Sequence, residues 1–438
     1  MDMIISGGED NLLESLSFNL PPTTSYIQQR RLVSYYPSGA STFAPNGVRV
    51  CRFTIAGDGW LDPSSLRVYA KLACTDTGGN FLQLADGPHS LFSRCRLFIG
   101  GTLVEDIDMY NRSHQLFRRI LMPNDWCVND AIESGLQSSI EGAAGSSSPG
   151  IASQRLAAGK YAMWNMQPLL GILNCGKYLP LRLSGGMQLE LTLSDAADAV
   201  AAGSSTSYEI QEMSLRCAVS KLDSALESSF AQMMMQNRAL TLNLATISTQ
   251  LQSLPAGNSE MSISLVRAFS RLNALFIHFQ GSSAADTPAA NKHTVTSFLN
   301  PSAFAVGGVV SGVATHDEAT ISWEVQLGSL KFPESPATSI PETFSLLRQA
   351  TAIYDESIRT LNLSPQTYAA NSFVIGVPLQ NVPGAAFSGL NTRSGDLISV
   401  RAKQMATDNT VNAPGRVYVT LISEQIVEIH EGSVAVLD

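Results

Sequence analysis

Histidines are the residues of this 438-residue chain whose spacing would most directly mark a metal site. A site built on one segment places two histidines within a few positions of each other. No histidine has another at such a spacing; the six are His89, His114, His278, His293, His316 and His430. We therefore expect no metal and no cofactor. His278 lies in the apolar run 276–279, and we interpret it as a hydrogen-bonded strand histidine.

Nucleophilic and acid–base chemistry find no better support in the sequence. There is no G-x-S-x-G turn to present a catalytic serine, and the glycine pairs lack the lysine of a phosphate-binding loop. The carboxylate pairs Glu105/Asp106 and Asp125/Asp130 could act as acid and base, but solvation at loops and strand edges explains them equally well. We interpret the methionine triplet 233–235 as core packing. The sequence predicts a protein that is not an enzyme.

The six cysteines indicate free thiols rather than a disulfide framework. No two are at C-x-x-C spacing, and Cys51, Cys74, Cys95 and Cys217 lie inside apolar or alternating runs. A thiol in such a run packs as a small hydrophobic group. The first residues also lack the basic segment and apolar run of a secretory signal. We therefore expect the chain to fold in a reducing cell interior.

Charge is sparse for a chain of this size. Charged residues make up 15% of the sequence, against roughly 25% in typical soluble domains. A chain with so few charges is expected to hide much of its surface in subunit contacts, although a β-rich domain with small-residue loops would have a similar composition. The net charge is −9 and no run of Lys or Arg occurs, which argues against direct nucleic-acid binding.

The elements that would position any site are mostly strands. Apolar and polar residues alternate at 66–72 and 321–327, as in half-buried strands. Other segments with strand character are 48–55, 91–99, 103–104, 161–168, 187–193, 208–220, 241–253, 261–269, 272–280, 372–379, 397–404 and 416–429. Helices are predicted at 108–121, at 223–237 behind a capping box that starts at Ser224, and after Ser339, where Pro341 and Glu342 follow. Residues 135–158, 196–207 and 281–318 are predicted loops.

The two halves of the chain repeat one order of elements. A strand, a glycine turn at Gly100 or Gly328, and a helix follow each other in both halves, and Gly185 and Gly395 each precede a later strand. This order predicts an all-β fold of two tandem eight-stranded jelly-roll barrels with a few short helices. The expected divisions are an N-terminal arm (1–24), a first barrel (25–222), a linker helix (223–238) and a second barrel (239–438).

Two parts of the sequence are candidate contact surfaces. Leu12, Leu13 and Leu16 are apolar anchors in an otherwise polar arm that we expect to order only against a neighbour. Trp126 follows a proline in a predicted loop and is the best candidate for an exposed stacking platform, whereas Trp323 is expected in the core. An exposed tryptophan on a jelly roll would suit a lectin-like attachment protein, which stays open as an alternative. A bicupin-type metalloenzyme is a weaker one, since the histidine spacing does not favour it.

The order and several local motifs resemble a known family. The run 92–101 (FSRCRLFIGG), followed by Val104, Glu105 and a tyrosine-containing helix, is similar to the first barrel of double jelly-roll major capsid proteins. The run 328–333 (GSLKFP) before the Ser339 helix, and the closing segments 387–392 and 417–437, are similar to the second. That family builds tailless icosahedral double-stranded DNA viruses, including polinton-like viruses, large algal viruses and membrane-containing phages.

The resemblance implies a mode of assembly. Three copies with two barrels each would form a homotrimeric, hexon-like capsomer with a pseudo-hexagonal outline that tiles the facets of a virion capsid. The expected partners are neighbouring capsomers, penton proteins and minor capsid or cement proteins, together with an internal membrane reached by the N-terminal arm. The loops 122–160 and 281–318 would project outward or clasp adjacent subunits. Assembly would take place inside the host cell.

Overall fold

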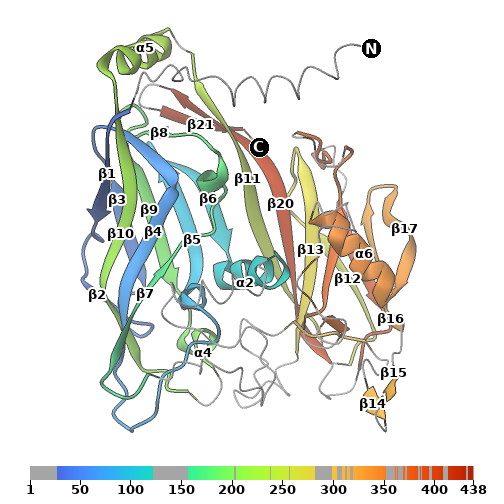
Figure 1. Ribbon diagram of the computed structural model, residues 1–438. Coiled ribbons are helices and arrows are strands. Elements are labelled where there is room, and N and C mark those ends of the chain that lie inside the picture. Colours follow the sequence, from blue (N-terminus) through green and yellow to red (C-terminus); the bar gives the residue numbers. More distant parts are fainter. Residues whose placement is uncertain are drawn as a thin grey trace, which may run out of the picture.

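A computed structural model describes residues 27–437 apart from 122–155, 282–297, 352–360 and shorter gaps at 202–203, 237, 256, 303–307, 311–312, 316–318, 362, 364–367, 370–371, 383–384, 386, 394–396, 408–412 and 431–432. The described chain forms two β-sandwiches side by side (Figure 1). No helix in these residues is long and apolar enough to cross a membrane.

The first sandwich consists of two antiparallel sheets. One sheet, which we call the outer sheet, has the order β1 (Ile27–Tyr35), β10 (Tyr208–Leu222), β4 (Trp60–Cys74), β7 (Tyr161–Met166). The short strand β2 (Thr42–Phe43) also pairs with β10, and β8 (Leu179–Pro180) also pairs with β4. The inner sheet has the order β3 (Val50–Ile55), β9 (Met187–Leu193), β5 (Phe92–Ile99), β6 (Thr102–Asp108). Side chains alternate between buried and exposed along β3, which is the pattern of a strand with one face on a core.

The second sandwich repeats the arrangement. One sheet has the order β11 (Leu240–Ser253), β20 (Pro414–His430), β13 (Leu272–Gly281), β18 (Val374–Pro378), with β21 (Ser433–Leu437) paired to β20. The other has the order β12 (Glu260–Leu265), β19 (Ile398–Lys403), β16 (Ala319–Leu327), β17 (Leu330–Ser339). A small hairpin, β14 (Gly308–Val310) and β15 (Val313–Thr315), lies within the segment expected to be a loop at 281–318.

The two sandwiches have the same topology. When the eight main strands of each are numbered along the chain, both read 1-8-3-6 in one sheet and 2-7-4-5 in the other. The helices α2 (Tyr110–Leu121) and α6 (Ile340–Ala350) both lie between the fifth and sixth strands. Paired sheets in this order form a jelly roll, so the prediction of two tandem jelly rolls is confirmed.

Equivalent two-residue turns connect the fourth and fifth strands of each barrel. Ile99 pairs with Thr102 around Gly100 and Gly101, and Leu327 pairs with Leu330 around Gly328 and Ser329. All three glycines have positive φ, which such tight hairpin turns require. The glycine motifs that suggested the repeat therefore mark the same turn in both barrels.

The helix predictions are confirmed in place, with one error at a cap. Ser339 Oγ accepts a hydrogen bond from the Glu342 amide at the start of α6, as predicted. The linker helix α5 (Ser224–Met235) is instead capped by Asp223, whose carboxylate accepts from the Ala225 amide. The predicted Ser224 cap is thus wrong by one residue, because Asp223 provides an equally good acceptor one position earlier. A one-turn helix, α4 (Ala196–Ala199), starts the predicted loop 196–207.

Two of the eight-per-barrel main strands, β1 and β17, were not predicted. The residues of β1 are exposed on both faces over most of its length, so no alternation of apolar and polar residues signals it. β17 carries Pro333 and Pro336, which do not suit a central strand, and its position at the edge of its sheet explains why they are tolerated.

The hydrophobic cores do not follow the expected domain division. The first core includes residues of β11 and β20, among them Leu244 and Val427, and the second core includes Leu116 and Ile120 of α2. Each barrel therefore buries side chains supplied by the other half of the chain. The residue boundaries of the expected domains stay a prediction. Cys51, Cys74, Cys95 and Cys217 are buried in the first core, as expected for small hydrophobic side chains.

Candidate functional site

Helix α2 lies between the two barrels and joins their cores (Figure 1). The rings of Phe117 in α2 and Phe276 in β13 make an edge-to-face contact with centroids 5.7 Å apart. This geometry adds favourable ring electrostatics to the burial of apolar area. The apolar contacts of α2 therefore hold the two barrels in one relative orientation.

Polar contacts at the same junction are buried and specific. The hydroxyl oxygens of Ser113 in α2 and Thr249 in β11 are 2.7 Å apart, and Thr249 is in turn 3.1 Å from the hydroxyl oxygen of Thr420 in β20. Arg119 Nη1 donates a 2.9 Å hydrogen bond to Ser372 Oγ. Since such bonds tolerate little displacement, they fix the position of α2 on the second barrel.

A cluster of titratable side chains lies where α2 packs on the 3₁₀ turn η1 (Pro88–Leu91). The rings of His89 and His114 stack with centroids 4.4 Å apart, although the two residues are far apart in sequence. His89 Nε2 donates a 2.8 Å hydrogen bond to Gln115 Oε1 and lies 3.8 Å from Asp86. Arg118 Nε lies 3.4 Å from the same Asp86 carboxylate. The sequence spacing gives no sign of this pair, which the chain brings together only on folding.

The cluster favours neutral imidazoles. Burial, together with the positive charge of Arg118, lowers the pKa of His89 to about 3. Burial, His89 and Arg118 also hold the pKa of His114 well below its usual range. Among the residues that the structure describes, no group of three potential ligands could hold a metal ion. We interpret the cluster as a structural polar core that ties η1 to α2.

His278 in β13 is the second buried histidine site. Its ring stacks on Tyr418 of β20 with centroids 5.0 Å apart and packs against Phe298 at 4.8 Å. Within the described part of the chain, neither ring nitrogen has a hydrogen-bond partner, so the prediction of a hydrogen-bonded histidine is wrong. Burial and nearby Arg112 lower the pKa of His278 to about 3. The ring acts as a flat, neutral packing group.

Glu105 is a buried carboxylate in β6, which corrects its interpretation as a solvated strand-edge residue. It is 1% exposed, and its two oxygens accept hydrogen bonds of 2.9 Å from the amides of Gly171 and Ile172. These amides begin the 3₁₀ turn η2 (Gly171–Asn174), which packs on β11 of the second barrel. Burial raises the pKa of Glu105 to about 7, and the two amide hydrogen bonds oppose that rise only in part. Its role is to hold η2 at the junction.

The predicted contact residues lie outside the described residues. This applies to Leu12, Leu13 and Leu16 in the arm and to Trp126 in the loop, so their roles stay predictions. The tryptophans that the structure describes are buried: Trp60 packs on Phe230, Trp164 lies near Phe92, and Trp323 donates from Nε1 to Thr343 Oγ1 at 3.0 Å. The core position predicted for Trp323 is confirmed, and none of these three rings offers a sugar-stacking platform.

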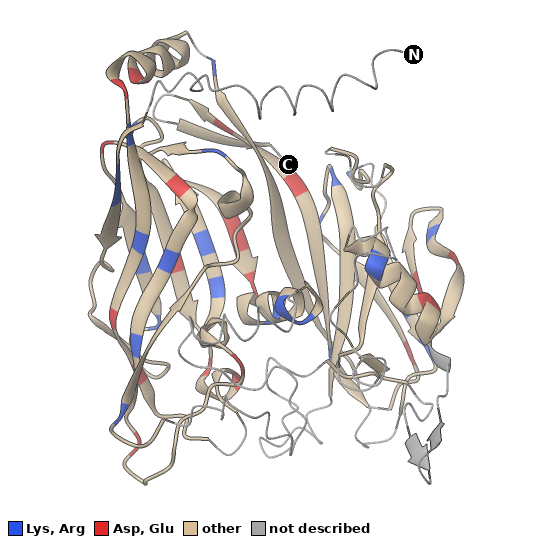
Figure 2. Cartoon of the chain, viewed as in Figure 1, with Lys and Arg blue, Asp and Glu red and all other residues tan. Residues whose placement is uncertain are grey.

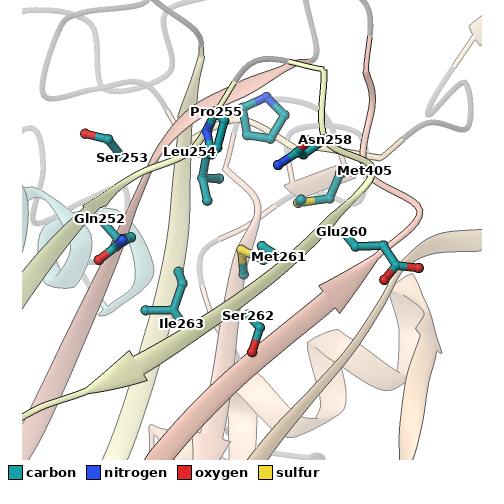
Figure 3. Close-up of a pocket in the computed structure, with 11 residues that line it drawn as sticks. Gln252, Ser253, Leu254, Pro255, Asn258, Glu260, Met261, Ser262, Ile263 and Met405 are labelled. Atoms are coloured by element: carbon teal, nitrogen blue, oxygen red, sulfur yellow. The ribbon is translucent and has the colours of Figure 1, made fainter.

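A shallow cavity of about 210 Å³ lies between the end of β11 and the start of β12 (Figure 3). Met261, Ile263 and Met405 supply its apolar wall. It is smaller than the roughly 300–1,000 Å³ typical of ligand pockets, and Glu260 is the one titratable residue among those that line it. The cavity therefore lacks the several titratable side chains that an acid–base or metal site would bring together.

Among the residues that the structure describes, the edges of the sheets are the clearest surfaces for contacts with other molecules. β1 and β7 are the two edges of the outer sheet in the first barrel. Leu32 on β1 is 81% exposed, and Tyr161 and Met163 on β7 are 62% and 52% exposed. An edge strand offers unpaired backbone groups as well as side chains, so it favours association with another chain. The sequence did not single out these residues because exposure cannot be read from their types.

Comparison with known proteins gives structural matches only. No family model and no curated protein matches the sequence. A chain of the quasi-atomic model of the PBCV-1 virus capsid aligns with a TM-score of 0.60 and 14% identity, over 96% of this chain and 99% of that one. A chain of the Sputnik virophage structure aligns with a TM-score of 0.59 and 12% identity, over 96% of this chain and 91% of that one. The Faustovirus major capsid protein aligns with a TM-score of 0.59 and 8% identity, over 95% of this chain and 94% of that one.

These alignments define the class of fold. They extend over both barrels, because nearly the whole of this chain is covered in each case. At such low identity the likeness concerns the fold alone. The chain has the double jelly-roll fold of viral major capsid proteins, which confirms the resemblance noted in the sequence.

Proposed function

We propose that the chain is a major capsid protein that forms homotrimeric capsomers in the shell of an icosahedral double-stranded DNA virus. The observation that carries the proposal is the identical strand order of the two barrels. Three copies would present six barrels of one topology around a threefold axis. Such a particle has a nearly hexagonal outline and can meet six neighbours in similar ways.

This role needs two barrels in a fixed relation, and the junction supports it. A capsomer that tiles a flat facet would lose its register if its barrels rotated against each other. The shared cores, the contact between Phe117 and Phe276, and the buried hydroxyl pair Ser113–Thr249 oppose such rotation. The buried polar groups of the junction thus serve to hold the two barrels together.

Lateral contacts in the shell would use edges rather than pockets. The exposed side chains Leu32, Tyr161 and Met163 on edge strands, and the low charge content of the chain, suit surfaces that become buried on assembly. The partners we propose are two further copies in the capsomer, neighbouring capsomers, and penton and minor capsid or cement proteins. The protein would then reside in the virion capsid after assembly in the host cell, without direct contact to the genome.

Electron microscopy of the purified full chain tests the proposal. We expect class averages of single particles with threefold symmetry and a pseudo-hexagonal outline. Two-lobed particles the size of one chain, at micromolar concentration, would count against it. The double variant Tyr161→Ser/Met163→Ser should weaken contacts between subunits, whereas Val48→Ser, which changes a side chain 51% exposed in the connection before β3, serves as a surface control outside the edge strands.

A further inference from the structure

Two edge strands meet at the junction between the barrels. The fifth strand of the first barrel, β6, packs on the first strand of the second barrel, β11, and the two belong to different sheets. Val104 and Glu105 of β6 are adjacent in sequence and both are buried, and the four successive residues 246–249 of β11 are buried as well. Since adjacent residues of a strand point to opposite faces, both faces of each strand are covered where the two strands meet.

The same two strand positions stand open elsewhere in the chain. β17 is the fifth strand of the second barrel and β1 is the first strand of the first barrel, and both lie entirely within the described residues. In β17 only Ala337 is buried, and β1 has no buried residue. Helix α6, which follows β17, has two buried residues, whereas α2, which follows β6, has eight. A single chain therefore leaves uncovered the positions that its own junction covers.

β1 and β17 lie at opposite edges of the molecule, with the junction helix α2 between them (Figure 1). Within one chain they therefore do not meet, and a contact of the junction type between them has to join two copies. Such a contact is heterologous, because it joins different surfaces of identical chains, and it closes into a ring when the rotation between copies allows. In a ring of three copies, three contacts between chains would alternate with the three junctions within chains.

Both open strands expose apolar side chains. Leu32 on β1 is 81% exposed and Leu330 on β17 is 52% exposed. An exposed edge can pair with a further strand, but Pro333 and Pro336 interrupt the row of backbone N–H groups of β17. β6 and β11 likewise meet without joining one sheet. β17 is therefore suited to packing through side chains, as in the junction, rather than to extending a sheet.

The unpaired charges of the two strands are opposite in sign. β1 carries Arg30 and Arg31, and β17 carries Lys331 and Glu334, with no other charged residue in either strand (Figure 2). Arg30 and Lys331 already form ion pairs within the chain, at 2.7 Å and 3.1 Å. Arg31 and Glu334 form no ion pair in the described part of the chain. Each strand thus keeps one charge free, and the two free charges attract each other.

We propose that β17 of one copy packs on β1 of the next copy, as β6 packs on β11 within the chain. The contact buries Leu32 and Leu330. It also pairs Arg31 with Glu334. The occupant of each surface is a second copy of this chain, because the two strand positions already form an interface inside the chain and the contact extends that interface from copy to copy. The inference rests on the proposed function and assigns the surfaces through which the copies of a capsomer meet.

Photo-cross-linking of the full chain tests the contact. A light chain with benzoylphenylalanine in place of Leu32 is assembled together with isotopically heavy wild-type chain, and the cross-linked peptides are identified by mass spectrometry. We expect cross-links that join the light β1 to the heavy β17. The same group in place of Val266, an exposed residue outside both strands, is the matched control and should give no such mixed cross-link.

The mass of the wild-type chain in solution separates this inference from the proposed function. If the wild type has the mass of a trimer and the group at position 32 labels other parts of the neighbour, the inference is overturned and the proposed function stands. Cross-links between two β1 strands would make the contact isologous and would overturn the inference in the same way. A stable mass of a single chain overturns both.

Charge reversal tests the pairing of Arg31 with Glu334. Arg31→Glu and Glu334→Arg each place like charges across the contact, so each should raise the concentration at which half of the trimer dissociates by about tenfold. The double variant Arg31→Glu/Glu334→Arg should restore the wild-type value, and Arg393→Glu, which reverses an exposed charge outside both strands, should leave it unchanged. Sedimentation over a dilution series measures these values. Single variants without effect, or a double variant that dissociates more readily than either, would overturn the pairing.

Discussion

The side-chain amide of Gln425 in β20 donates a 2.7 Å hydrogen bond to the backbone carbonyl oxygen of Val104 in β6. The bond is buried and links strands of different barrels that are 321 residues apart in sequence. It supplies a partner to a carbonyl that the contact between the barrels removes from water. We therefore regard it as part of the junction that makes the two barrels one rigid unit.

Gln425→Leu should destabilise the junction, because the Val104 carbonyl would stay buried without that donor. The expected loss is about 1–3 kcal/mol in the free energy of unfolding. Guanidinium denaturation at one fixed protein concentration measures it. Gln29→Leu, on the exposed strand β1, is the matched control and should change stability little. Equal midpoints for Gln425→Leu and the wild type would show that the bond contributes nothing.

Gly171→Ala should disturb the same junction by steric overlap. A Cβ atom at Gly171 would overlap the Ala245 carbonyl oxygen in β11, and neither backbone can move freely. We expect a loss of about 1–3 kcal/mol, as for other overpacked sites. At Gly47 the nearest atom to a new Cβ is 3.6 Å away, so Gly47→Ala is the control. Thermal unfolding of both variants distinguishes them, and similar melting temperatures would contradict the tight approach of η2 and β11.

His278→Phe should reduce the sensitivity of the protein to acid. The pKa of His278 is about 3 in the folded chain and has its ordinary value of 6.5 in the unfolded chain. Between pH 6.5 and pH 3 the unfolded chain therefore binds a proton that the folded chain does not. Stability is therefore fully present above pH 6.5 and falls as the pH drops towards 3. At pH 5 the share of the loss that comes from His278 is about 2 kcal/mol, so between pH 7 and pH 5 the phenylalanine variant should lose that much less stability than the wild type. Denaturation series at pH 7 and pH 5 test this, and parallel losses in both proteins would refute it.

Glu105→Gln should change the pH dependence in the opposite direction. The pKa of Glu105 is raised from 4.5 to about 7 by folding, so the folded state binds more protons between these values. The contribution of Glu105 to the free energy of unfolding is therefore most favourable below pH 4.5. It falls by about 3 kcal/mol as the pH rises to 7. The variant lacks this titration, so its stability relative to the wild type should improve from pH 4.5 to 7. A constant difference over this range would contradict the assignment.

The sequence predicted the parts of the fold that follow from local pattern. Clean alternation revealed β16, and the Ser339 cap revealed the start of α6, because both signals depend on neighbouring residues. β1 was missed, since an edge strand exposed on both faces carries no periodic signal. β17 was missed because its prolines suggest a loop until its edge position is known.

The buried polar groups could not be predicted, because they depend on contacts between distant segments. His89 and His114 meet only when η1 packs on α2. The sequence does not distinguish a buried glutamate from a solvated one at a strand edge, and Glu105 is seen to be buried only once η2 packs against it. His278 was expected to form a hydrogen bond, whereas the rings of Tyr418 and Phe298 surround it instead.

The mass of the purified full chain in solution tests the central claim most directly. Light scattering coupled to gel filtration at micromolar concentration should give three times the chain mass of 46.9 kDa. That value would support a capsomer of three double barrels. A stable mass of a single chain under the same conditions would contradict it.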